Sequence, residues 1–192
     1  MNSADTITWE ERRAVSERLI GEAEAFSPEF FTRVKGQCGL LVFVYCGQEL
    51  GGRLWDDPVP QIIFVGHNDA DSIRHWQDDT AISTVRRSLA ALLSGSYALE
   101  ARPKSADPTD ADRFANYRLA ADSESRLTAW MKENIRIAFQ PTPPEAQEAY
   151  YLALIDYNTP MFNFQHNPNN KMGNLIKTYR LQMAEQAARC EP

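Results

Sequence analysis

Few side chains in this sequence are of the types that bind metal ions or act as nucleophiles, and their spacing matches no recognised motif. Its three histidines, His67, His75 and His166, are too widely separated to predict a metal-ligating motif. Three cysteines without a CxxC pair predict neither a disulfide framework nor a zinc site, so we expect buried, reduced thiols. No nucleotide-binding glycine loop and no serine hydrolase elbow is present. These residues therefore predict no metal ion or cofactor.

Basic side chains offer a different chemistry, the binding of phosphate. Four of them could form a local strip for nucleic acid on an otherwise acidic protein: Arg86, Arg87, Lys177 and Arg180. The net charge of -6 works against general affinity for DNA, because that affinity comes largely from lysine and arginine contacts with phosphate. The alternative interpretation is that these residues lie on solvated helix faces and are balanced by nearby acidic residues.

Length and composition predict an ordinary globular protein. With 192 residues, of which 43% are hydrophobic and 24% charged, the chain can bury a substantial core and is expected to form a single domain over residues 1–192. No apolar stretch approaches the roughly 18 residues typical of a membrane span, and the N-terminus does not read as a signal peptide. We therefore expect a cytoplasmic protein without membrane association.

The first half of the chain predicts one helix and then two strands. Thr8 and Glu11 have the spacing of a capping box, which predicts a helix from Thr8 to about Phe26. Residues 40–45 and 61–65 are short apolar runs rich in β-formers, and they predict buried strands. The connection between them is long, so the strands need not form a tight hairpin.

The second half predicts alternating helices and strands. A helix is expected over 83–93, with Val85 and Leu89 on its buried side, Arg86 projecting elsewhere and Gly95 as its stop. Thr142 with Pro143, Pro144 and Glu145 has the pattern of a capped helix start, and that helix should continue to about Tyr157. The remaining expected elements are a loop over 100–112, a short strand over 116–119, a helix around 127–135, a strand over 136–139 and a last helix over 173–189.

Three separated phrases carry a resemblance to a known family. They are Gly39-Leu40-Leu41, Phe64-Val65-Gly66, and Leu154-Ile155 followed by Pro160 and Asn163. Over roughly residues 36–167 they resemble the GIY-YIG nuclease superfamily. The segments 83–93 and 127–131, together with the ending from Leu154 to Asn163, resemble a bacterial branch of it. The resemblance implies an α/β domain with a small mixed β-sheet flanked by helices, to which residues 1–35 and 168–192 add helical extensions.

The same resemblance implies an active site whose residues are mostly replaced. Family members use strand tyrosines, an arginine and a metal-binding glutamate to hydrolyse phosphodiesters. Here Leu41 and Phe64 stand at the tyrosine positions, and Tyr151 stands at the glutamate position. The arginine position falls near His75 or Trp76, with Arg74 displaced by one or two residues. We expect Leu41, Phe64 and Tyr151 to line one concavity of a catalytically degenerate protein, whose partner is DNA, another protein or a second copy of the chain.

An alternative is a DNA endonuclease with a rearranged site that depends on Mg²⁺ or Mn²⁺. Tyr45 shares a strand face with Leu41, Glu148 lies one helical turn before Tyr151, and Arg74 with His75 could contact phosphate. In the opposite interpretation, these are ordinary core and surface residues. Reuse of the fold for unrelated small-molecule chemistry also stays open, because a fold does not specify a function.

Overall fold

Four strands pair into one antiparallel sheet in the computed structural model, which describes residues 7–47, 61–68, 75 and 79–190. The order across the sheet is β1 (Glu24–Ala25), β6 (Ile135–Pro141), β2 (Gly39–Tyr45) and β3 (Gln61–His67). The predicted α/β class, with a small sheet flanked by helices, is confirmed. The sheet is antiparallel rather than mixed in the described residues, because β6 runs against both β1 and β2, and β3 runs against β2.

The chain divides into two compact units. The sheet unit contains Met1–Ile73 and Lys132–Met172, and the helical unit contains Arg74–Met131 and Gly173–Pro192. Within the described ranges, no helix is long and apolar enough to cross a membrane.

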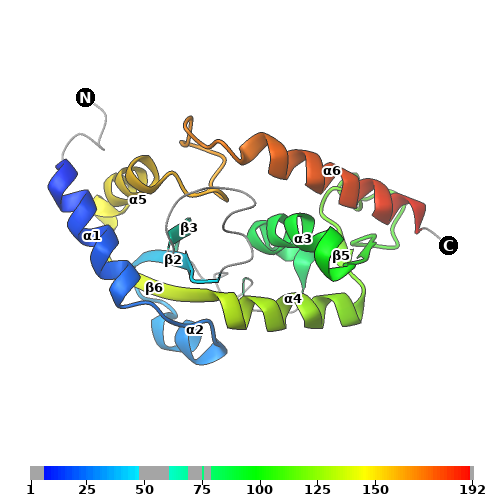
Figure 1. Cartoon of the computed structure of the whole chain (residues 1–192), viewed down its shortest axis with the longest axis horizontal. Helices are drawn as coiled ribbons and strands as arrows, with labels where there is room; N and C mark the ends of the chain where they lie inside the picture. The colour runs from blue at the N-terminus through cyan, green and yellow to red at the C-terminus, as the bar shows by residue number, and fades with distance from the viewer. Residues whose placement is uncertain (1–6, 48–60, 69–74, 76–78, 191–192) are drawn as a thin grey trace. The chain divides into compact units, whose positions relative to one another are not determined.

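One face of the sheet packs on two helices, α1 (Trp9–Gly21) and α5 (Pro144–Asn158). These helices lie side by side, with Trp9 edge-on to Tyr157 at 5.5 Å between ring centroids (Figure 1). Alternate residues of β2 face them. The core on this side consists of Leu19, Leu40, Val42, Val44, Ile62, Val65, Ala138, Leu154 and Ile155.

The opposite face of the sheet is covered by aromatic side chains and by α2 (Pro28–Val34). Phe43 contacts Phe26 and Phe64 edge-on at 5.5 and 5.4 Å between ring centroids. The sequence predicted one helix from Thr8 to about Phe26. The structure instead ends α1 at Gly21, because Ser27 caps a new helix by accepting a hydrogen bond from the Phe30 N–H, and Pro28 suits the first helical position.

Close packing explains the glycine of the Phe64-Val65-Gly66 phrase. The Phe64 ring lies over Gly66, so that a Cβ atom at position 66 would approach the ring to 2.7 Å. Gly66 stands opposite Leu41 in the ladder between β2 and β3, and a register shift lies between Phe43 and Val44. A side chain at position 66 would force the Phe64 ring away from the sheet.

The helical unit is built around α3 (Thr84–Tyr97), which packs on α6 (Gly173–Arg189). α6 has the predicted bounds. α3 continues past the expected stop at Gly95 and ends where Ala98 adopts the left-handed conformation, with φ 46°. A short 3₁₀ helix, η3 (Thr80–Ile82), precedes α3, and β4 (Ala101–Arg102) pairs with β5 (Arg118–Leu119) before α4 (Ala121–Asn134) begins. β4 falls within the segment that was expected to be a loop.

The start of α5 differs from its prediction in one detail. Pro143 is the N-cap and makes no side-chain capping bond. The Thr142 hydroxyl instead donates to the Gln140 carbonyl oxygen at 3.2 Å, and the Thr142 N–H donates to the Cys38 carbonyl oxygen. Thr142 therefore extends the β6 edge rather than capping the helix.

Candidate active site

Four polar side chains of the sheet unit gather where β3 ends beside α5. The ring centroids of His67 and Tyr151 lie 4.7 Å apart, and those of Tyr151 and His166 lie 6.4 Å apart. His67 Nε2 is 3.7 Å from Glu148 Oε2. Glu148 and Tyr151 are one turn apart on α5 and share a side of that helix. The structure thus brings His67, Glu148, Tyr151 and His166 together, on the part of the fold where the sequence placed the family's glutamate.

Tyr151 is held as a neutral phenol at this site. Burial raises the pKa of Tyr151 above its usual value, and the negative charge of Glu148 raises it further. A hydrogen bond with Asn163 acts in the opposite direction but does not offset the burial. Because an ordinary phenol already ionises only near pH 10, Tyr151 carries no negative charge at neutral pH. It can neither replace a carboxylate on a divalent cation nor act as a ready general base.

Asn163, beside this cluster, binds the backbone of β3 through its side-chain amide. Its side-chain oxygen accepts from the Val65 N–H at 2.9 Å, and its side-chain nitrogen donates to the Val65 carbonyl oxygen at 2.7 Å. Asn163 itself is 5% exposed. The amide therefore pairs with the outer edge of β3 as another strand would, which protects an edge that would otherwise offer free backbone groups.

Leu41 and Phe64 do not belong to the cluster. Tyr151 packs against the core that contains Leu40, Val42 and Val65, whereas Leu41 and Phe64 alternate with those residues and face the α2 side of the sheet. Leu41 is 1% exposed. The prediction that Leu41, Phe64 and Tyr151 line one concavity is therefore wrong, because the sheet separates them.

Tyr45 also lies on the far side of the sheet from Glu148. It shares the Leu41 face, as strand alternation predicts, and it is 0% exposed at the end of β2. The structure does not bring Tyr45 and Glu148 into one site, so the two residues cannot act together as the rearranged site would require.

The expected arginine region is described only at His75. Arg74 and Trp76 lie outside the described residues. His75 is 6% exposed in the helical unit, where its Nδ1 is 2.9 Å from the Ser83 hydroxyl oxygen. Ser83 also caps α3 by accepting from the Arg86 N–H. His75 is therefore held inside the helical unit beside a helix cap, in a position that gives a phosphate little access to its ring.

The predicted phosphate-binding strip is not formed as expected. Arg86 is 0% exposed and Arg87 is 7% exposed, so the expectation that these two arginines project to the surface is wrong. Burial lowers the pKa of Arg87 to about 10, and the nearby Arg180 contributes to this shift. Arg180 is half-buried, and burial lowers its pKa as well. Lys177 alone of the four lies at an exposed position.

The buried arginine belongs to a polar network that sequence reasoning missed. Arg86 Nη2 donates to Glu124 Oε2 at 2.8 Å and to the Thr128 hydroxyl at 3.0 Å. Glu124 also accepts from the Thr80 N–H and hydroxyl, both at 2.8 Å, and from the Leu119 N–H at 3.0 Å. This network ties η3, α3, β5 and α4 together. The sequence carried no signal for it, because the carboxylate that pairs with Arg86 lies 38 residues further along the chain.

Comparison with known families decides the assignment. The family model described as GIY-YIG catalytic domain matches residues 60–183, well over half of the chain. The chain belongs to the GIY-YIG family. Neither the curated proteins nor the solved structures contain a significant match. Family membership connects the chain with nuclease-like, nucleic-acid-related functions and confirms the resemblance drawn from the sequence.

The range matched to the GIY-YIG model begins just before β3 and ends within α6. It includes Phe64, Tyr151 and Asn163, but not the Gly39-Leu40-Leu41 phrase on β2. The predicted core over residues 36–167 and the single-domain organisation stay predictions.

The described residues of the cluster beside α5 offer few ligands to a divalent cation. Position 151 carries a neutral phenol, and the nearest carboxylate of the cluster is that of Glu148, which faces His67. Among the residues that the structure describes, no group of three or more histidine, cysteine, aspartate or glutamate side chains could hold a metal ion.

Proposed function

We propose that this GIY-YIG protein has lost metal-dependent phosphodiester cleavage and acts as a nucleic-acid-associated module. The observation that carries the proposal is the state of Tyr151. Its phenol stands at the glutamate position, and burial raises its pKa, so the site lacks the anionic ligand on which the family's chemistry depends.

The two apolar replacements support the same proposal. Leu41 is buried against the α2 side of the sheet, and Phe64 packs edge-on against Phe43. Neither side chain can transfer a proton, and both contribute to packing. Substitution of catalytic tyrosines by residues that pack well is what we expect when a fold is retained without its chemistry.

A nicking assay tests the loss of cleavage. Purified protein is incubated with supercoiled plasmid and with a short labelled duplex, in Mg²⁺ or Mn²⁺, beside a GIY-YIG enzyme that retains its glutamate as positive control. We expect no metal-dependent product. Robust nicking by the wild-type chain that EDTA abolishes would contradict the proposal.

A second candidate function is a divalent-metal-dependent DNA endonuclease with a rearranged site. The observation that favours it is the Glu148 carboxylate, exposed at 58% of its side chain and 3.7 Å from His67. Glu148 and His67 would hold the Mg²⁺ or Mn²⁺ ion in this case. The test is Glu148→Gln, which would abolish nicking, whereas Glu145→Gln, at an exposed position of the same helix, would leave it unchanged. Equal nicking by both variants would remove this candidate.

A further inference from the structure

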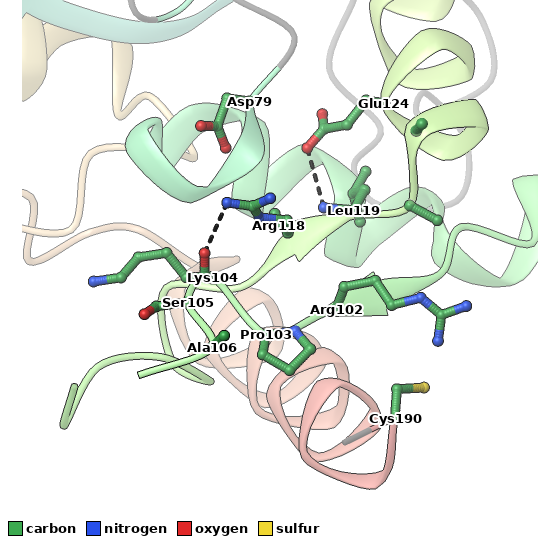
Figure 2. A pocket seen from close by; sticks show the side chains of 12 residues that line it. Asp79, Arg102, Pro103, Lys104, Ser105, Ala106, Arg118, Leu119, Glu124 and Cys190 are labelled. Carbon is green, nitrogen blue, oxygen red and sulfur yellow. Dashed lines mark hydrogen bonds between the residues drawn. The ribbon is translucent and has the colours of Figure 1, made fainter. Parts of the chain in front are cut away.

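The helical unit contains a cavity of about 890 Å³ that lies apart from the cluster beside α5 and has no part in the function proposed above. Figure 2 shows it between the β4–β5 pair, the start of α4 and the end of α6. Its volume lies within the range of small-molecule sites, which is roughly 300–1,000 Å³. The lining residues that the argument uses are Asp79, Arg102, Pro103, Lys104, Arg118 and Leu119.

The charge of the lining favours an anion. Arg102, Lys104 and Arg118 contribute three cations. Glu124 also borders the cavity, but its carboxylate is ion-paired with Arg86 at 2.8 Å and its side chain is only 7% exposed. Among the described lining residues, Asp79 is then the one carboxylate outside that buried pair, and one of its oxygens accepts from the Ala81 N–H at 2.9 Å.

Arg118 is the side chain best placed to receive an anionic group. Its guanidinium donates to the Lys104 carbonyl oxygen at 2.8 Å, and Figure 2 shows it lying between Asp79 and the Lys104 backbone. Within the described part of the chain, Arg118 forms no ion pair with a carboxylate. Guanidinium groups bind phosphate and carboxylate through paired hydrogen bonds, and most of the donors of Arg118 are free for this purpose.

Arg102 and Lys104 can leave their present ion pairs and bind a ligand with little loss of free energy. Arg102 pairs with Glu100 at 2.8 Å and Lys104 pairs with Asp110 at 3.0 Å, and in both pairs the side chains are partly exposed. Exposed ion pairs of this kind contribute only about 0–1 kcal/mol. Pro103 and Leu119 add apolar surface beside the cations, which suits the organic part of a ligand.

We propose that this cavity binds a phosphate-bearing organic ligand of mononucleotide size, with the phosphate held by Arg118 and Lys104. The ligand is either a free nucleotide or the phosphorylated end of a nucleic-acid strand, because both present the same chemistry. The proposal goes beyond the function proposed for the family site, and all its residues lie in the helical unit.

Calorimetric titration with four probes tests the ligand class. The probes are AMP, adenosine, a short oligonucleotide with a 5′-phosphate and the same oligonucleotide with a 5′-hydroxyl. We expect AMP or the phosphorylated oligonucleotide to bind, and their counterparts without phosphate to bind at least about tenfold more weakly. Binding of AMP alone identifies the free nucleotide, and binding of the phosphorylated oligonucleotide identifies the strand end. Equal binding with and without phosphate, or no binding by any probe, overturns the proposal.

Two lining variants and one matched control locate the binding. Arg118→Gln should weaken the affinity at least about tenfold, because a charge-assisted contact is lost. Asp79→Asn keeps an acceptor for the Ala81 N–H and removes the opposing charge, so it should tighten binding. Arg13→Gln changes an exposed arginine of α1 and should have no effect. The same affinity in Arg118→Gln and Arg13→Gln, with circular dichroism showing both folded, overturns the assignment.

Cys190 provides an independent reporter, since it lines the cavity and is only partly exposed. Cys38 and Cys46 are exposed, contrary to the expectation of buried thiols, so they are first replaced by serine. In this background, saturating ligand should slow alkylation of Cys190 several-fold in the wild-type cavity but not in Arg118→Gln. An unchanged alkylation rate at a ligand concentration that saturates the calorimetric signal would place the binding elsewhere and overturn the proposal.

Discussion

At the scale of single residues, burial decides what an arginine does in this protein. Arg86 is 0% exposed and serves the interior through Glu124, whereas Arg118 is exposed and available to a ligand. The sequence alone could not show which of these two arginines is buried and which is exposed. Arg86 precedes the small and apolar residues of a helix, and its partner comes from α4, far along the chain, so the normal expectation was a solvated side chain.

Removal of the Glu124 charge should destabilise the protein strongly. Glu124→Gln leaves the Arg86 guanidinium buried without its counter-charge, and such a change typically costs about 3–5 kcal/mol. Urea denaturation followed by circular dichroism measures the effect. Glu100→Gln breaks the exposed pair with Arg102 and serves as control, with an expected loss below about 1 kcal/mol. Similar losses of unfolding free energy in the two variants would show that the buried ion pair stabilises the protein no more than the exposed one does.

One buried phenol, that of Tyr117, and one partly buried phenol, that of Tyr151, make stability depend on alkaline pH. Burial raises the pKa of both Tyr117 and Tyr151, so the folded state keeps protons that the unfolded chain releases near pH 10. The unfolded state then binds fewer protons, and the free energy of unfolding should fall as pH rises above about 10. Denaturation curves between pH 8 and about 11 should show this fall, with a shallower slope in Tyr151→Phe. Identical slopes in the wild type and the variant would contradict the assignment to Tyr151.

At the scale of elements, the spacing of apolar residues predicted more of the helices and strands than the helix-capping residues did. The strand over 40–45 and the helices over 83–93 and 173–189 were found because their apolar spacing agrees with the burial that the fold imposes. α2 and β1 were missed because the capping box at Thr8 fixes where a helix begins but not where it ends. The candidate site was predicted only at α5, since which face of β2 and β3 looks toward α5 depends on pairing that the sequence does not state.

The two hydrogen bonds between the Asn163 side chain and the Val65 backbone, here called the Asn163 bridge, should contribute measurably to the free energy of unfolding. Asn163→Ala would leave the buried N–H and carbonyl oxygen of Val65 without these partners, for which we expect a loss of about 1–3 kcal/mol. Thermal and urea denaturation measure it. Asn169→Ala, at an exposed position in the same loop, should be close to neutral. Hydrogen exchange at Val65 should accelerate in Asn163→Ala alone, and unchanged exchange there would count against the bridge.

At the scale of the whole molecule, the net charge of -6 limits association with nucleic acid. With Arg86 and Arg87 buried, only Lys177 and Arg180 of the predicted strip can reach a phosphate. We therefore expect weak binding that depends on a small number of contacts rather than on a broad basic surface.

Salt titration with labelled duplex and single-stranded DNA measures that binding. Affinity should fall with salt, and the double change Lys177→Gln with Arg180→Gln should reduce the slope of log K against log salt by about 2. Arg13→Gln is the control. The absence of any association at low salt, together with a stable dimer in a measurement of solution mass, would contradict the nucleic-acid role and favour a protein-interaction module.

The Phe64 ring over Gly66 has a consequence for how relatives of this protein are recognised. The glycine is required by the space beneath a neighbouring ring, and phenylalanine fills that space as well as tyrosine does. The glycine at position 66 is therefore compatible with either ring at position 64, with or without a hydroxyl. Spacing of this kind therefore reports a shared architecture, and it does not by itself report which side chains take part in catalysis.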